Sequence, residues 1–399
     1  MSDGHLEDKL YYLYDQYGEN LMDPIGPVGI IPLRGSEELA ADVNAKLYER
    51  RLAYHGYGSS EHNHAAFLRK DYRISTQFDR YCTGEGRVVI NDSIRGHDVF
   101  VLVDVLNHSC EYKLFGKRKF MTPDEHYQDL KRVILAISGR ARRVNVIMPF
   151  LYDSRQHHRS GRESLDCAYM LEELHDLGVN SIITFDAHDP RVANAIPVSG
   201  FENISAAYQI IKGLKKEIPT LGPKNERLVI ISPDEGALER SMFFANMLGA
   251  QLGTYFKRRD FTKVVNGRNP ILKHEFLGDS VEGMDVLIID DMIASGESML
   301  DICRSMKEMK ARNIYCAGTF ALFTAGLEAF NQAYRDGCLT RLISTNLIYR
   351  TPELRAAPWF REVSLSKFIA LLIDAMNHDS SLSTFTQPTE KIETFLRKG

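Results

Sequence analysis

Two neighbouring aspartates, Asp290 and Asp291, end an apolar run and stand directly before a group of small and hydroxyl-bearing residues. Carboxylates at a strand end can accept hydrogen bonds from sugar hydroxyls, and the free N–H groups at the start of a following helix can bind a phosphate. The pattern therefore indicates a sugar-phosphate site, with a helix cap made by Asp291 as the alternative. The loop that would bind the phosphate is Ala294, Ser295, Gly296, Glu297 and Ser298.

Two further strand ends also carry polar groups that suit phosphate chemistry. Asp234 follows the apolar run 228–232, where a carboxylate can ligate Mg²⁺ together with substrate phosphates, or simply cap a helix. His188 stands between Asp186 and Asp189 after the run 181–185, which favours a metal or phosphate site over an isolated surface histidine. Three acidic strand ends in one chain are harder to explain by helix capping alone than one such strand end would be.

A basic segment, which includes Lys257 and Arg259, follows the apolar run 251–256 and shows no helical periodicity. Such a stretch suits a mobile lid that brings cations to a transferring phosphoryl group, because phosphoryl transfer is catalysed mainly by positioning and charge neutralisation. A solvated basic loop is the alternative. The position of this segment between two candidate anion sites favours the lid.

Alternating strands and helices must position these residues. Amphipathic segments separate the apolar runs, and one opens at Thr122 with Pro123 and with Glu125 placed to close a capping box. This alternation predicts an α/β protein with two domains, each a mostly parallel sheet flanked by helices. The expected strands are 28–33, 99–103, 144–148 and 181–185, and then 228–232, 251–256, 285–289 and 313–320.

The domain boundary is expected near 205–225, where polar residues, prolines and a glycine interrupt the alternation. The first 24 residues are polar and are expected to be peripheral, and the tail after Ser380 shows no apolar period. The predicted divisions are an N-terminal extension (1–24), a first domain (25–210), a second domain with the sugar-phosphate loop (211–362), and a C-terminal helix and tail (363–399).

Composition excludes several classes of function. The 399 residues carry a formal net charge of −4, which gives no broad attraction to nucleic acid or to an anionic membrane. The six cysteines show no paired CxxC spacing, which argues against a zinc cluster and for a reduced compartment. No leader pattern or span-length apolar run is present. We expect a cytoplasmic protein without nucleic-acid or membrane partners.

Seven segments, taken in order, resemble the ribose-phosphate pyrophosphokinase (phosphoribosyl diphosphate synthetase) family over most of residues 28–386. They identify the chain as a divergent, bacterial-type member. The segments are RYCTGEGRVVINDSIRGHDVFVL, FLYDSRQHHRSGRES, FDAHDPRV, ISPDEGALER, FKRRD, IIDDMIASGES and LSKFIALLIDAMNHDSSLSTF.

The resemblance implies a role for each candidate residue. The ATP-binding residues would be Tyr81, Thr83, Glu85, Arg155, Gln156 and His188. The Mg²⁺ ligands would be His188 and Asp234, and the catalytic cations would be Lys257 and Arg259. The ribose 5-phosphate site would be Asp290, Asp291, Ala294, Ser295, Gly296, Glu297 and Ser298.

The implied reaction converts ATP and D-ribose 5-phosphate to 5-phospho-α-D-ribose 1-diphosphate and AMP, which feeds nucleotide biosynthesis. The implied architecture is two phosphoribosyltransferase-like domains in a homo-oligomer built from dimers, commonly a hexamer. The chain departs from the family at Thr83 and Ala294, where an aspartate is usual, and at Glu297, where a glycine is usual. His157 and His158 replace an acid and a lysine, and an insertion occupies 108–126.

Three rival functions share parts of this pattern. A phosphoribosyltransferase would consume the sugar diphosphate, but it would not need the Arg155–Gln156 loop or the basic lid. A non-catalytic regulatory homologue would be expected to lose metal or lid residues, which this chain keeps. A diphosphotransferase acting on a larger ribose 5-phosphate derivative is motivated by Ala294 and Glu297.

Overall fold

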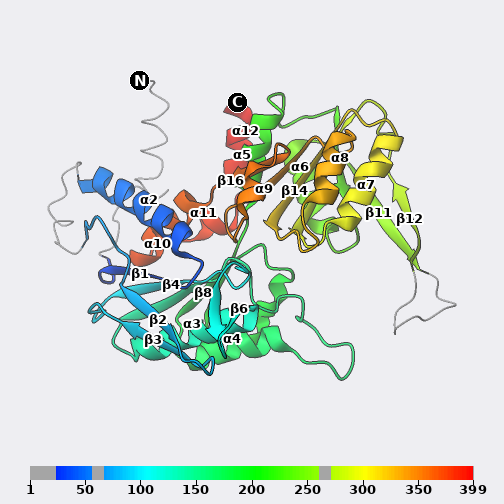
Figure 1. Cartoon of the computed structure of the whole chain (residues 1–399). Coiled ribbons are helices and arrows are strands. Elements are labelled where there is room, and N and C mark those ends of the chain that lie inside the picture. The colour runs from blue at the N-terminus through cyan, green and yellow to red at the C-terminus, as the bar shows by residue number, and fades with distance from the viewer. Residues whose placement is uncertain (1–23, 56–66, 260–270, 399) are drawn as a thin grey trace. The chain divides into compact units, whose positions relative to one another are not determined.

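The computed structural model describes residues 24–55, 67–259 and 271–398, with the side chains of residues 54–55, 257–259 and 271–274 left out. The chain forms two compact units, and each is built from strands and helices (Figure 1). The first contains residues up to Ile204 together with Leu365–Thr386, and the second contains Ser205–Ser364 together with Gln387–Gly399. No helix in the described ranges is both long enough and apolar enough to cross a membrane.

The first unit is built on a five-stranded sheet in the order β1-β4-β7-β8-β9, in which every neighbouring pair is parallel. Four of these strands are apolar runs that are almost wholly buried, as expected for a parallel sheet covered on both faces. The strands are β1 (Val28–Pro32), β4 (Asp98–Leu102), β7 (Arg143–Ile147), β8 (Ser181–Phe185) and β9 (Gly200–Ile204).

Helices and two hairpins complete the first unit (Figure 1). The helices are α2 (Glu37–His55), α3 (Pro123–Ile137), α4 (Asp166–Asp176), the 3₁₀ helix η2 (Pro190–Ala195), α10 (Ser366–Asn377) and α11 (Ser383–Thr386). One hairpin joins β2 (Thr76–Arg80) to β3 (Gly86–Ile90), and the other joins β5 (Glu111–Leu114) to β6 (Lys117–Phe120). The insertion seen in the sequence at 108–126 therefore contains the β5–β6 hairpin.

The start of α3 agrees with its sequence signature. Pro123 occupies the first turn, and a Glu125 carboxylate oxygen accepts the backbone N–H of Thr122 at 2.8 Å. Leu130, Val133 and other apolar residues of the helix are buried.

The second unit is built on a seven-stranded sheet in the order β12-β11-β10-β13-β14-β15-β16. Every neighbouring pair is parallel except β11–β12. The strands are β10 (Leu228–Ser232), β11 (Gln251–Arg259), β12 (Ile271–Leu277), β13 (Asp285–Ile293), β14 (Asn313–Ala321), β15 (Arg341–Thr345) and β16 (Phe360–Val363). The helices are α5 (Ala207–Glu217), α6 (Leu238–Leu248), α7 (Glu297–Glu308), α8 (Glu328–Arg335), α9 (Pro352–Ala356) and α12 (Thr389–Lys398).

The basic segment predicted to leave a strand at residue 256 is itself the end of a strand. β11 continues through Arg259 and pairs with β12, so that the backbone of Lys257 lies opposite His274 and that of Arg259 opposite Ile271. The loop prediction was wrong for 257–259 because the return strand β12 supplies hydrogen-bond partners that local periodicity does not reveal. The expected lid residues 260–270 lie outside the described residues.

The tail also differs from its prediction. Residues 389–398 form helix α12, which buries Ile392 and Leu396 and packs on α5 and α6. Two apolar residues one turn apart are too few to show a period in sequence. The helix therefore depends on the surface it covers.

Candidate functional site

The carboxyl ends of β10, β13 and β14 meet at one edge of the second sheet, because these strands are parallel neighbours. Asp290 and Asp291 lie near the end of β13, and residues 294–296 connect that strand to α7. This edge is the usual position for a ligand site in an open parallel sheet. The structure therefore places the predicted sugar-phosphate residues on one strand-to-helix connection.

Gly296 allows this connection to turn tightly. Its φ of +82° lies in the left-handed region, and a Cβ at this position would lie 2.3 Å from Cζ of the buried Phe330. Glu297, at the first helical position, is exposed, and its N–H donates to Ser295 Oγ at 3.4 Å. Only glycine fits at position 296, because any side chain there would collide with Phe330. The backbone at the start of α7 is therefore not covered by a side chain at this position.

Asp290 and Asp291 lie close enough for each to affect the other's charge. The N–H of Asp291 donates to Asp290 Oδ1 at 2.8 Å, and Asp291 is 9% exposed. Burial, and then the neighbouring charge of Asp291, raise the pKa of Asp290 well above its usual range, with a smaller contribution from Asp234. The raised pKa favours the protonated form of Asp290, which can donate as well as accept hydrogen bonds.

Asp234 lies after β10 on the same edge. Its Oδ1 accepts the N–H groups of Gly236 at 3.0 Å and Ala237 at 3.2 Å, so it orders the turn before α6, whose own N-cap is Ala237. Among the described residues, no group of three or more His, Cys, Asp or Glu side chains is arranged to hold a metal ion. A carboxylate of this kind suits Mg²⁺ only when substrate phosphates supply further ligands.

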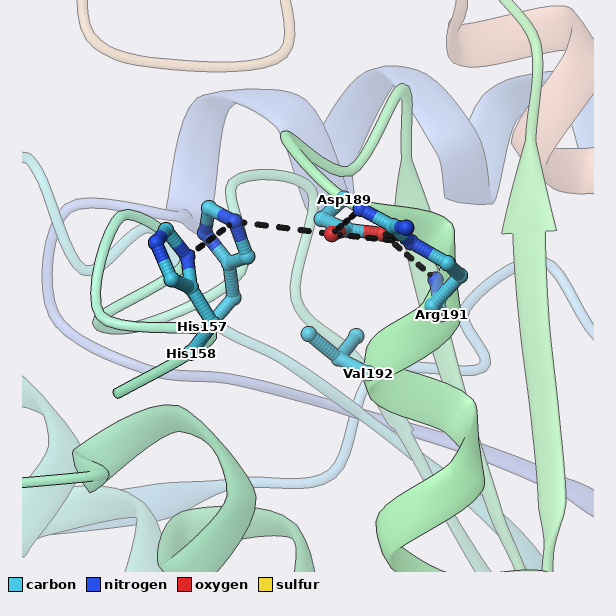
Figure 2. A pocket seen from close by; sticks show the side chains of 5 residues that line it. All are labelled: His157, His158, Asp189, Arg191 and Val192. Atoms are coloured by element: carbon cyan, nitrogen blue, oxygen red, sulfur yellow. Dashed lines mark hydrogen bonds and ion pairs between the residues drawn. The ribbon is translucent and has the colours of Figure 1, made fainter. Parts of the chain in front are cut away.

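In the first unit, the end of β8 meets the loop after β7 at a cavity of about 440 Å³. Figure 2 shows His157 and His158 on one side and Asp189 and Arg191 on the other, with Val192 between them. Asp189 begins η2 and binds the Arg191 guanidinium through both carboxylate oxygens, at 2.9 Å from Nε and 2.6 Å from Nη2. Hydrogen bonds from Arg191, opposed by burial, lower the pKa of Asp189 to about 2.

The Arg155–Gln156 loop and His188 come together here. The His157 and His188 rings lie 5.4 Å apart, and His157 Nε2 lies 3.4 Å from Asp189 Oδ2. Gln156 Nε2 donates to the carbonyl of Ser164 at 2.7 Å, and the Arg155 and His188 side chains are exposed. The structure thus joins two segments that the sequence proposed separately for ATP.

Arg191 was missed as a candidate from the sequence. Its only local signal is the pair Asp189–Pro190 before it, which gives the N-cap and first residue of a short helix. The first turn of η2 places the Arg191 guanidinium on the Asp189 carboxylate, two residues before it in the chain.

The third predicted ATP segment is the turn between β2 and β3. The Tyr81 N–H donates to the Glu85 carbonyl at 2.9 Å, and Thr83 Oγ1 donates to Glu85 Oε2 at 2.8 Å. All three side chains are exposed, with Tyr81 at 55%. The structure gathers these residues on one tight turn. The side chains of Lys257 and Arg259 lie outside the described part of the chain.

Comparison with known proteins agrees with this architecture. Residues 28–178 match the N-terminal domain of ribose phosphate pyrophosphokinase, and residues 197–336 match the phosphoribosyl transferase domain. The ribose-phosphate pyrophosphokinase of Pasteurella multocida is 26% identical over 307 residues, which cover 76% of this chain and 88% of the relative. Ribose-phosphate pyrophosphokinase 1 of Lactococcus lactis is 25% identical over 348 residues, or 84% of this chain and 97% of the relative.

A solved structure has the same fold. The crystal structure of phosphoribosylpyrophosphate synthetase from Mycobacterium smegmatis superimposes with a TM-score of 0.70 at 19% identity. The match covers 88% of this chain and 99% of that one. The likeness shows that the chain has the α/β fold of that protein over most of its length.

Proposed function

Because the chain belongs to the ribose-phosphate pyrophosphokinase family, we propose that it transfers the terminal diphosphate of ATP to D-ribose 5-phosphate. The C1 hydroxyl oxygen of the sugar attacks the β-phosphorus, the bond from that phosphorus to the α-phosphate oxygen breaks, and the hydroxyl proton is released. The products are 5-phospho-α-D-ribose 1-diphosphate and AMP. No covalent enzyme intermediate is needed, so the protein acts by positioning and charge stabilisation.

The observation that carries this proposal is the β13–α7 connection, which begins after the half-buried Asp290 and the buried Asp291. Asp290 and Asp291 would bind the ribose hydroxyls, and the raised pKa of Asp290 would let its carboxyl group donate as well as accept. The loop N–H groups from Ala294 to Ser298 would bind the 5-phosphate at the start of α7. Glu297 is exposed at the first helical position, from which its carboxylate can point away from that phosphate.

The first unit would bind the nucleotide. Tyr81, with Thr83 and Glu85 beside it, offers an exposed aromatic ring and hydrogen-bonding groups to the adenine base. Arg155 and Gln156 would meet the phosphates beside the cavity that contains His157 and Arg191. These assignments follow the resemblance of the segments that carry the residues to the family's motifs.

The family resemblance implies that Asp234 and His188 would each give one ligand to a Mg²⁺ ion, with ATP phosphate oxygens as its further ligands. When bound, the ion neutralises phosphate charge. Lys257 and Arg259 would meet the charge that develops on the moving diphosphate. We further propose a cytoplasmic enzyme of nucleotide biosynthesis that assembles as a homo-oligomer from dimers, with a hexamer as the expected form.

Phosphorus NMR of purified protein with Mg²⁺, ATP and ribose 5-phosphate tests the reaction. We expect the sugar diphosphate and AMP to appear in equal amounts. Lys257→Ala should lower turnover by about 10²–10³-fold, because a cation that stabilises the transition state is removed. Lys310→Ala, whose side chain is 74% exposed beside Glu282, is the matched control and should keep full activity.

Other products would contradict the proposal. ADP in place of AMP would indicate a kinase, and diphosphate released without ATP would indicate a phosphoribosyltransferase. Wild-type turnover in Lys257→Ala would exclude the assigned catalytic cation. Absence of any transfer by the folded protein would favour the regulatory homologue.

A second candidate follows from the altered phosphate loop. Ala294 and the exposed Glu297 change the group of residues that would bind the 5-phosphate, which motivates a larger ribose 5-phosphate derivative as the acceptor. A panel that compares ribose 5-phosphate with nucleotide-linked riboses tests this. A kcat/KM at least about tenfold higher for a linked ribose, or about 1.4 kcal/mol in transition-state stabilisation, would favour the derivative.

A further inference from the structure

The inserted β5–β6 hairpin has one face turned toward the protein. Tyr112, Leu114 and Lys119 are half-buried, whereas Lys113, Phe115 and the other residues between them are exposed. The hairpin ends meet where the Met121 N–H donates to the Cys110 carbonyl at 2.8 Å. The insertion is therefore a separate element, and its half-buried side chains contact other parts of the first unit.

That inner face contacts the turn between β2 and β3. The Phe115 N–H donates to the Cys82 carbonyl at 3.2 Å, within the turn that carries Tyr81 and Glu85. Gly84 has a φ of +95°, and a Cβ there would lie 2.8 Å from Leu114 Cδ1. The tip of the inserted hairpin thus packs directly against the backbone of the turn.

Helix α3 holds both hairpins. The Tyr112 hydroxyl and Lys119 Nζ both donate to Glu125 in the first turn of α3, the latter at 3.1 Å. One turn later, Asp129 binds Arg80 at 2.7 Å, and the Arg80 guanidinium also lies 5.2 Å from the centre of the Tyr112 ring. The inserted hairpin, the turn and the helix therefore form one connected network of charged and aromatic contacts.

We propose that the β5–β6 hairpin is a brace that fixes the Tyr81–Glu85 turn in the geometry that binds the nucleotide base, with Leu114 and Tyr112 as positioning residues. This inference rests on the proposed function, because it takes the turn to be the base site of ATP. An exposed turn that is already ordered loses less conformational freedom on binding, so the brace raises nucleotide affinity without touching the nucleotide. It leaves the sugar site and the chemical step unchanged.

Excision of the hairpin from the full-length chain is the central experiment. Replacement of residues 111–120 by Gly-Gly places Cys110 and Met121 as the first and fourth residues of a β-turn, which preserves their existing hydrogen bond. We expect the KM for ATP to rise by about tenfold or more, with kcat and the KM for ribose 5-phosphate within about twofold of wild type. Discrimination between ATP and GTP should fall by a similar factor.

Point variants separate positioning from general stability. Leu114→Ala should reproduce part of the rise in the ATP KM, and Leu114→Met should restore it because the contact with Gly84 is kept. Leu135→Ala, on the exposed side of α3 at 61% exposure, is the matched control and should leave all constants unchanged. Circular dichroism should show the same folded content in every variant.

Hydrogen exchange tests the brace independently of catalysis. The backbone amides of residues 81–85 should exchange faster in the excised variant than in wild type. If wild type transfers no diphosphate, the proposed function fails, and unchanged exchange at 81–85 would separately overturn the brace. An unchanged ATP KM in an active excised variant, or a change of oligomeric state alone, would overturn it too and make the hairpin a spacer or an interface.

Discussion

Burial of Asp290 beside Asp291 determines how the substrate-free protein responds to pH. The folded-state pKa of Asp290 is raised, first by burial and then by its neighbour, whereas the unfolded chain releases its proton near 3.8. The folded state therefore binds more protons than the unfolded state between these two pKa values. The protonated form of Asp290 makes its whole contribution to the free energy of unfolding below the unfolded-state pKa. This contribution is lost as pH rises through the folded-state pKa.

Asp290→Asn should therefore stabilise the substrate-free protein at alkaline pH while abolishing sugar binding. We expect the free energy of unfolding at pH 9 to rise by about 1.4 kcal/mol or more, the equivalent of one pKa unit. Urea unfolding at pH 5 and pH 9 measures this, and the gain should be smaller at pH 5. The control is Asp301→Asn, on the exposed face of α7 at 61% exposure. An equal rise in the free energy of unfolding for Asp290→Asn and Asp301→Asn would show that the environment of Asp290 does not destabilise its charged form.

At the same scale, sequence reasoning found the acidic strand ends but missed Arg191. Strand ends are visible because apolar runs stop at them, and the parallel order then brings Asp290 and Asp234 to one edge. Arg191 lines the cavity together with His157 and His158, which lie more than 30 residues earlier in the chain. No periodic pattern in the sequence brings segments so far apart together.

Among the elements, α3 connects local sequence rules to the candidate nucleotide site. Its capping box was predictable from Thr122 and Glu125, because the signature lies within four residues. The inserted hairpin and helix α12 were not assigned from sequence. Their order depends on partners far along the chain, as Leu114 depends on Gly84 and Ile392 on α5.

Glu125 should make α3 sensitive to acid. Burial acts to raise its pKa, but hydrogen bonds from Tyr112, the Thr122 N–H and Lys119 outweigh burial and lower the pKa of Glu125 to about 2. Because the folded-state pKa is lowered, the ionised Glu125 makes its whole contribution to the free energy of unfolding above pH 4.5. This contribution is lost as pH falls toward 2.

Glu125→Gln should cost about 0.5–2 kcal/mol at pH 7, as for other lost helix caps. The difference from wild type should shrink as pH falls from 4.5 toward 2, because the wild-type carboxylate then becomes neutral as well. Urea unfolding at pH 7, 4 and 3 measures the difference. Glu49→Gln, which is 62% exposed on α2, should show little effect at any pH. A cost that stays constant with pH would mean that the charge of Glu125 is not what stabilises the helix.

For the whole chain, the first unit is not contiguous. Helix α10 belongs to it although it follows the entire second sheet, and it packs beside α2 (Figure 1). Arg51 Nε binds Asp374 Oδ1 at 2.9 Å, Arg50 Nε binds Oδ2 at 2.6 Å, and Arg51 Nη2 binds Asn377 at 2.8 Å. These partners are separated by more than 320 residues of sequence, so no periodicity could have paired them.

Asp374→Ala should therefore destabilise the first unit strongly, by about 3–5 kcal/mol, because it leaves the fully buried Arg51 without its counter-charge. Urea unfolding followed by hydrogen exchange in β1 and β4 measures the loss in this unit. Glu49→Ala, which breaks an exposed ion pair with Lys46 on the same helix α2, should change the free energy of unfolding by less than about 0.5 kcal/mol.

The same contact predicts that the first unit cannot fold before α10 has been synthesised. A fragment that ends at residue 362 keeps every strand of the first sheet but lacks Asp374 and Asn377, so Arg51 would be buried without either partner. We expect that fragment to lose the cooperative unfolding of its first sheet, and addition of residues 363–386 to restore it. Cooperative unfolding of the shorter fragment at wild-type denaturant concentration would show that α10 covers the first unit without stabilising it.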